Sequence, residues 1–232
     1  MAKQPRIVLI HATRVAIDPI ETAFAALWPE AGTLSILEEG LSADLASGFA
    51  TQAELDRRIV SLADYAGGLS PDAILFTCSA FGTGIEEAAR KNSVPVLKPN
   101  EAMFEAAIGA GGRVAMLYTF PPAAKGMERE FRQEAARRGT VSDIRPVFVP
   151  DALDALKAGD TATHDRLVSE AAARIGETEA EAVLLAHFSM TRAANMVRRS
   201  TRLPVFTSPE TAISKLRRCL EAPRNEEVTL EC

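Results

Sequence analysis

The stretches Ala73-Ile-Leu-Phe-Thr-Cys78 and Ala182-Val-Leu-Leu-Ala-His187 decide the fold of this chain. Each is apolar at nearly every position before its last residue, as expected of a parallel strand that helices cover on both faces. Helix patterns alternate with these and other short apolar runs, and such alternation indicates an α/β protein with a parallel sheet. The two stretches start 109 residues apart. They suggest that one α/β unit occurs twice.

The same spacing recurs along the chain. Pro95-Val96 and Pro204-Val205 are also 109 residues apart, while Arg6-Ile-Val-Leu-Ile10 and Arg113-Val-Ala-Met-Leu117 are 107 apart. Nearly equal spacings over most of the chain indicate internal duplication. We therefore expect two pseudosymmetric lobes, each a short parallel sheet flanked by helices, with the active site in the cleft between them.

The predicted boundaries follow from this repeat. Lobe 1 is expected to span residues 1–111, that is about 1–98 plus a crossing helix, and lobe 2 residues 112–232. The C-terminal helix has the option of packing back on lobe 1. Within the first half, the patterns predict strands at 6–11, 34–37 and 73–77 and helices at 19–28, 52–65 and 85–91.

Composition excludes several classes of partner. The chain has 232 residues and a formal net charge of −5, and no basic run is interleaved with aromatic residues, so a nucleic-acid partner is not expected. Its apolar runs are too short for a membrane span, and residues 1–10 lack the form of a signal peptide. A cytoplasmic protein is expected, with a homo-oligomer left open.

Cys78 stands between a buried strand and the small residues of Ser79-Ala-Phe-Gly-Thr-Gly84. Near a helix N-terminus the dipole and free amides favour thiolate, so we expect a pKa below the ordinary value of about 8.5 and a role as base or nucleophile. The alternative is a small apolar side chain that fills space at a strand end.

His187 occupies the position equivalent to Cys78 in the second copy. By itself a histidine there is more often a hydrogen-bonded structural group. Because imidazole titrates near neutrality, the pair at matched strand ends is instead expected to transfer protons on opposite faces of one substrate carbon.

The loops after the strands supply candidate substrate-binding residues. Hydroxyls, amides and a guanidinium at such ends can hold a carboxylate, although threonines there are often ordinary turn residues. The predicted binding residues are His11, Thr13, Arg14, Ser79, Tyr118, Thr119, Phe188 and Ser189.

No metal and no cofactor is expected. Zinc held by His11, Cys78 and His187 has weak support because their spacings form no local ligand motif, and no dinucleotide or phosphate-binding glycine motif follows either first strand. His164 lies in a polar stretch and is expected at the surface.

Three segments resemble the aspartate/glutamate/hydantoin racemase superfamily, which also contains maleate isomerase and arylmalonate decarboxylase. They are Leu75-Phe-Thr-Cys-Ser-Ala-Phe-Gly82, Pro99-Asn-Glu-Ala-Met103 with Gly112-Arg-Val-Ala-Met116, and Leu185-Ala-His-Phe-Ser-Met190. The resemblance implies cofactor-free chemistry at a carbon next to a carboxylate, with one catalytic cysteine from each lobe. Cys78 matches the first cysteine, whereas His187 replaces the second.

We therefore predict a cofactor-independent racemase or isomerase of a small amino acid, hydroxy acid or hydantoin-like substrate, acting through Cys78 and His187. One alternative is a decarboxylase, lyase or cis-trans isomerase that uses Cys78 alone. Another is a non-catalytic protein that binds small carboxylates.

Overall fold

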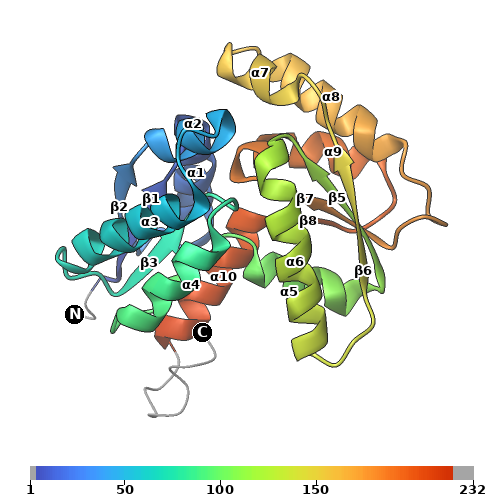
Figure 1. Ribbon diagram of the computed structural model, residues 1–232. Coiled ribbons are helices and arrows are strands. Elements are labelled where there is room, and N and C mark those ends of the chain that lie inside the picture. The colour runs from blue at the N-terminus through green and yellow to red at the C-terminus, as the bar shows by residue number, and fades with distance from the viewer. Residues whose placement is uncertain (1–3, 222–232) are drawn as a thin grey trace. The chain divides into compact units, whose positions relative to one another are not determined.

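The computed structural model describes residues 4–221, which divide into two compact units (Figure 1). The first unit holds residues 4–99 and 212–221, and the second holds residues 100–211. The chain therefore passes from one unit to the other twice, at Pro99/Asn100 and at Thr211/Ala212.

The first unit is built on a four-stranded parallel sheet in the order β2-β1-β3-β4. Its strands are β1 (Arg6–His11), β2 (Gly32–Leu37), β3 (Ala73–Phe76) and β4 (Val96–Leu97). The inner strands β1 and β3 are buried at every residue except Arg6, which explains why they are apolar without alternation. The strand predicted at 6–11 is confirmed, and the one predicted at 73–77 ends one residue earlier.

The helices of the first unit are η1 (Arg14–Ala16), α1 (Ile17–Leu27), α2 (Gly40–Ser47), α3 (Gln52–Gly67), α4 (Gly82–Lys91) and residues 212–221 of α10 (Ser208–Glu221). The start of α3 is fixed by a capping box, in which Thr51 and Glu54 bond each other's backbone N–H groups. Its inner face then buries Leu55, Ile59 and Ala63 in the core. The predicted helices are confirmed with shifted ends.

The second unit repeats this plan. Its parallel sheet has the order β6-β5-β7-β8, with strands β5 (Arg113–Tyr118), β6 (Asp143–Phe148), β7 (Ala182–Leu185) and β8 (Val205–Thr207). The register repeats as well, since Ile10 pairs with Phe76 in the first sheet and Leu117 pairs with Leu185 in the second. The predicted fold class, two α/β lobes of one plan, is confirmed.

The helices of the second unit are α5 (Glu101–Ala110), α6 (Pro121–Arg137), α7 (Ala152–Lys157), α8 (Thr161–Ala173), η2 (Phe188–Ala193) and α9 (Ala194–Ser200). Helix α6 begins at Pro121. Proline is well suited to this position because the first N–H groups of a helix have no hydrogen-bond partner within the helix. Helix α8 is capped by Asp160, whose carboxylate accepts the Thr163 N–H at 3.0 Å.

His164 lies in α8 and is fully buried, so the prediction of a surface position is wrong. The polar composition around it belongs to the outer face of the helix, whereas His164 shares the inner face with Val168. Its Nδ1 lies 2.7 Å from Oδ1 of Asp165, and that oxygen also accepts a hydrogen bond from Nε of Arg192 at 2.9 Å. The cluster joins α8 to η2.

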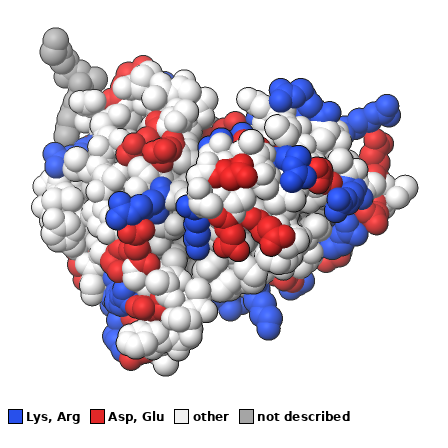
Figure 2. All heavy atoms as spheres, turned by 90° about the horizontal axis from the view of Figure 1, so that it is seen from above, with Lys and Arg blue, Asp and Glu red and all other residues white. Residues whose placement is uncertain are grey.

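The surface carries charges of both signs. On the face shown in Figure 2, basic and acidic side chains lie beside one another in several places, with areas free of charged residues between them, which agrees with the small net charge of −5. None of the helices within residues 4–221 combines the length and apolar character that a membrane crossing requires.

Candidate active site

Cys78 lies between β3 and α4, two residues after the buried strand ends. Its side chain keeps part of its surface exposed, while the neighbouring Thr77 and Ser79 are buried. The thiol sulfur accepts hydrogen bonds from the Ser42 hydroxyl of α2 and from the backbone N–H of Ala80. These donors hold the sulfur at the carboxyl end of the first sheet.

Burial raises the pKa of the Cys78 thiol above its ordinary value and outweighs the two hydrogen bonds, which act in the opposite direction. The expected lowering of this pKa is therefore wrong. Helix α4 begins only at Gly82, with Phe81 as its N-cap, so Cys78 lies outside its first turn. Because the dipole effect falls off within that turn, it contributes little to the thiolate.

His187 occupies the matching place in the second unit, two residues after β7 ends and directly before η2. It is also partly exposed between buried neighbours, Ala186 and Phe188. Its Nε2 accepts a hydrogen bond from the backbone N–H of Phe120 at 3.2 Å, which places the ring proton on Nδ1. Burial lowers the pKa of His187 to about 4, so the imidazole is neutral at pH 7.

His11 ends β1 and is fully buried. Its Nδ1 lies 2.8 Å from the Thr77 hydroxyl, and its Nε2 lies 3.2 Å from that of Ser35, which donates to Oε1 of Glu21 at 3.1 Å. Burial lowers the pKa of His11 to about 4. Both ring nitrogens are thus engaged within the first unit, and the side chain braces the segment that leads to Cys78.

The other predicted residues of the first unit differ in accessibility. Thr13 has an extended backbone before η1 and is partly exposed, and its side chain makes no capping bond. Arg14 is exposed and pairs with Oε2 of Glu39, with Nη2 at 2.8 Å and Nε at 3.0 Å. An anion bound by Arg14 would therefore have to displace the Glu39 carboxylate.

In the second unit, four predicted binding residues lie beside His187 or at the end of the adjacent strand β5. Tyr118 closes β5, and its ring contacts Phe148 with centroids 5.4 Å apart. Thr119 follows, buried, with no hydrogen-bond partner for its hydroxyl among residues 4–221. Phe188 and Ser189 are buried at the start of η2.

Several functional contacts could not be found by the sequence analysis. Ser42 and the backbone of Phe120 hold the two candidate catalytic side chains, and neither belongs to a motif. Thr207 and Asn100 each bury a side-chain group, Oγ1 and Nδ2, that has no hydrogen-bond partner among the described residues. Thr207 is the last residue of β8, so it lies at the carboxyl ends of the parallel strands, as Thr119 does. Unpaired buried polar atoms of this kind are costly unless a ligand or water meets them.

A sequence model of the Asp/Glu/hydantoin racemase family matches residues 11–216, nearly the whole chain. The chain belongs to the Asp/Glu/hydantoin racemase family. This membership makes it an enzyme of the Asp/Glu racemase type, as predicted.

Solved structures of racemases share the fold. Glutamate racemase RacE1 from Bacillus anthracis has a TM-score of 0.75 at 12% identity, over 94% of this chain and 82% of that one. Aspartate racemase from Picrophilus torridus has 0.72 at 14%, over 97% and 98%. Allantoin racemase from Klebsiella pneumoniae has 0.69 at 15%, over 96% and 95%. A search of curated protein sequences finds no match.

In this racemase-family enzyme, a thiol and an imidazole thus stand at the equivalent strand ends of the two units. Among residues 4–221, no group of three or more His, Cys, Asp or Glu side chains is arranged to hold a metal ion.

Proposed function

We propose that this enzyme is a cofactor-independent racemase or isomerase acting at the carbon α to a carboxylate of a small amino acid, hydroxy acid or hydantoin-like substrate. The observation that carries the proposal is the equivalence of Cys78 and His187. Each is a partly exposed, titratable side chain placed two residues beyond a buried inner strand. Both groups are proposed to act on one substrate carbon.

The protonation states support an assignment of acid and base for one direction of the reaction. At neutral pH the raised pKa of Cys78 keeps it as thiol, and the lowered pKa of His187 keeps it as neutral imidazole. Imidazole takes the α-proton from one face, and thiol gives a proton to the other. This leaves imidazolium and thiolate, which together carry as many protons as the starting imidazole and thiol. The imidazolium and thiolate pair can therefore catalyse the reverse reaction.

The carbanion formed on the way needs stabilisation, because a free carboxylate makes its α-hydrogen a poor acid. The unpaired hydroxyl of Thr119 is a suitable donor, and Ser79 and Ser189 adjoin the two catalytic groups. Thr13 and Arg14 are proposed to bind a substrate carboxylate. Tyr118 and Phe188 are proposed to form apolar walls that limit the size of the substrate. His11 is proposed to support the site through Thr77 rather than to contact substrate.

A second candidate is favoured by one contact. Because the Phe120 N–H occupies the Nε2 lone pair of His187, the neutral ring carries its proton on Nδ1 and in this arrangement is a hydrogen-bond donor rather than a base. His187 would then bind a carboxylate or a developing negative charge, and Cys78 alone would serve a decarboxylase, lyase or cis-trans isomerase. A base role requires His187 to exchange its bond with Phe120 for the substrate.

Incubation of single enantiomers of candidate acids and hydantoins in heavy water tests the proposal. We expect loss of optical activity together with deuterium at the α-carbon and no carbon dioxide. Release of carbon dioxide, or geometric isomerisation without α-exchange, would establish the Cys78-only alternative. Binding without any turnover of a broad substrate panel would overturn both.

The roles of the two groups are separated by His187→Gln and His187→Ala. A glutamine oxygen can still accept the Phe120 N–H while its amide donates to substrate, but it transfers no proton. If His187 is an acid/base group, both variants lose about a hundredfold to ten-thousandfold in rate. If it is only a donor, His187→Gln keeps most of the activity.

Cys78→Ala should impair both mechanisms. Arg90→Gln, on the exposed face of α4, serves as a control that leaves activity unchanged.

The cytoplasmic location, the lobe boundaries and the oligomeric state stay predictions.

A further inference from the structure

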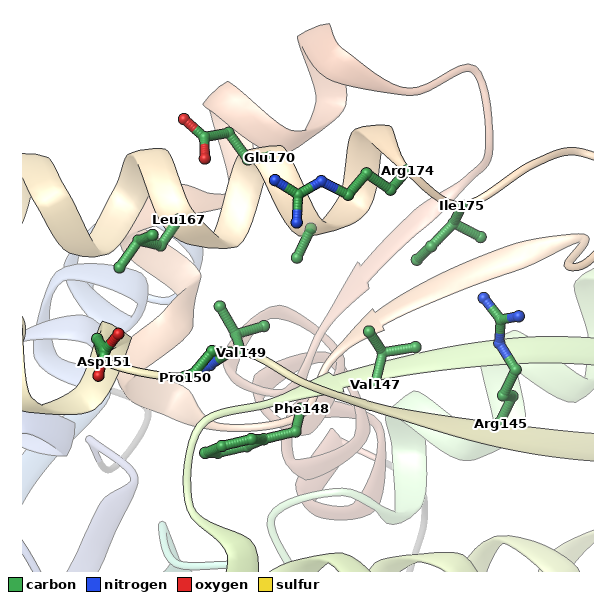
Figure 3. A pocket seen from close by; sticks show the side chains of 11 residues that line it. Arg145, Val147, Phe148, Val149, Pro150, Asp151, Leu167, Glu170, Arg174 and Ile175 are labelled. Atoms are coloured by element: carbon green, nitrogen blue, oxygen red, sulfur yellow. The ribbon is translucent and has the colours of Figure 1, made fainter.

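A cavity of about 210 Å³ opens between β6 and α8 in the second unit (Figure 3). None of the residues proposed for the active site lines it. On the strand side its wall is Val147 and Val149, whose side chains point towards α8, and on the helix side Leu167 points back towards the strand.

The internal repeat explains why this cavity exists. The caps of α3 and α8, Thr51 and Asp160, are 109 residues apart, so Leu62 of the first unit corresponds to Ala171 of the second. Leu62 packs against the hydrophobic core of the first unit. Ala171 lines the cavity and lacks the atoms that fill this place in the first unit.

A second difference between the two units is a salt bridge that is present in the first and missing at the equivalent position of the second. Arg58 in α3 bonds Asp44 of α2 and also Glu38, so it ties the helix to the segment after β2. The corresponding residue in α8 is Leu167, an apolar wall of the cavity. The second unit thus has an accessible apolar surface at the place where salt bridges join the helix to the neighbouring segment in the first unit. Apolar walls favour a ligand with an apolar body.

One cation beside this surface, Arg174, forms no ion pair with any residue that the structure describes. Arg174 follows α8, is exposed and lines the cavity. The nearest carboxylate on the helix, Glu170, is held by Arg166 at 2.7 Å. The other cation of the lining, Arg145, is paired with Glu179 at 3.2 Å. Figure 3 shows the guanidinium of Arg174 above the apolar walls.

We propose that the groove between β6 and α8 is a second small-molecule site, which binds a small organic carboxylate with a branched aliphatic body. The aliphatic part lies against Val147, Val149 and Leu167, and the carboxylate pairs with Arg174. The cavity is smaller than the roughly 300–1,000 Å³ of sites for drug-sized ligands, which limits the occupant to a few carbons. This inference does not rest on the proposed function.

The probe is isovalerate, titrated into the full chain and followed by methyl NMR at Val147, Val149 and Ile175. We expect these methyl signals to shift with a dissociation constant on the order of millimolar, as suits so few atoms. Isovaleramide, which has the same shape without charge, and acetate, which has the charge without the body, should each bind at least about tenfold more weakly. Equal binding of all three would overturn the proposal.

Two variants and a control locate the site. Ala171→Leu should fill the cavity as Leu62 does in the first unit and abolish the shifts. Arg174→Gln, at an exposed position that leaves folding intact, should weaken isovalerate about tenfold and leave isovaleramide unchanged. Arg129→Gln, an exposed arginine of α6 outside the lining, is the matched control and should bind like the parent chain. Unchanged isovalerate binding by Arg174→Gln would overturn the proposal, even if Ala171→Leu failed to fold.

Discussion

Two histidines of this enzyme, His11 and His187, are held neutral by burial. An imidazole whose pKa falls on folding takes up a proton more readily in the unfolded chain. Between the ordinary value of 6.5 and the folded value of about 4, the unfolded state therefore binds more protons. Stability that is fully present above pH 6.5 is lost as the pH falls towards 4.

We predict that lowering the pH from 7 to 4.5 destabilises the enzyme, with His11 contributing on the order of 3 kcal/mol to the free energy of unfolding. Urea titrations at several pH values measure this. In His11→Asn the curve of stability against pH should be shallower over the same range, whatever the absolute stability of the variant. A curve parallel to that of the parent chain would show that His11 is not the group responsible.

The same burial sets a prediction for the pH dependence of turnover. If neutral His187 and the thiol form of Cys78 start the reaction, kcat/KM should fall below about pH 4 as His187 becomes protonated. It should fall again only at a pH above the range in which an ordinary thiol titrates, because the pKa of Cys78 is raised. A rate that increases as the pH drops towards 4 would instead indicate that imidazolium is the active form.

At the scale of elements, the junction between α8 and η2 positions the segment that follows His187. Asp165 of α8 accepts hydrogen bonds from Arg192 of η2 at 2.9 and 3.2 Å. The Nδ1 atom of His164 contacts the same carboxylate. Since η2 begins directly after His187, this ion pair holds the segment through which the chain leaves His187.

Asp165→Asn is therefore predicted to lower kcat about tenfold with a smaller effect on KM, because a slight displacement of a reacting group is costly. Arg192→Gln should have a similar effect, and the losses in the double variant should be less than additive, since both single variants break the pair of Asp165 and Arg192. The control is Arg198→Gln, which breaks the pair between α9 and Glu210 without touching η2. Additive losses in the double variant would contradict a shared role.

At the scale of the whole molecule, the apolar strand runs and their repeated spacing predicted the fold class. The constant separation of apolar strands indicated two α/β units, and both sheets have the same strand order. It also placed Cys78 and His187 at equivalent strand ends. What spacing could not predict depends on contacts between distant residues: His11 meets Ser35 and Thr77, and the Cys78 sulfur meets Ser42. Burial of the thiol, which sets the direction of its pKa shift, likewise arises only when α2, β3 and α4 come together.

The two chain crossings described above also govern the order in which the polypeptide is made. A ribosome that has added residue 211 has synthesised the complete, continuous sequence of the second unit, whereas the first unit still lacks residues 212–221. The part translated first is thus the last whose sequence is complete. Because chains begin to fold during synthesis, the nascent first unit must remain one helix short until the whole second unit has left the ribosome.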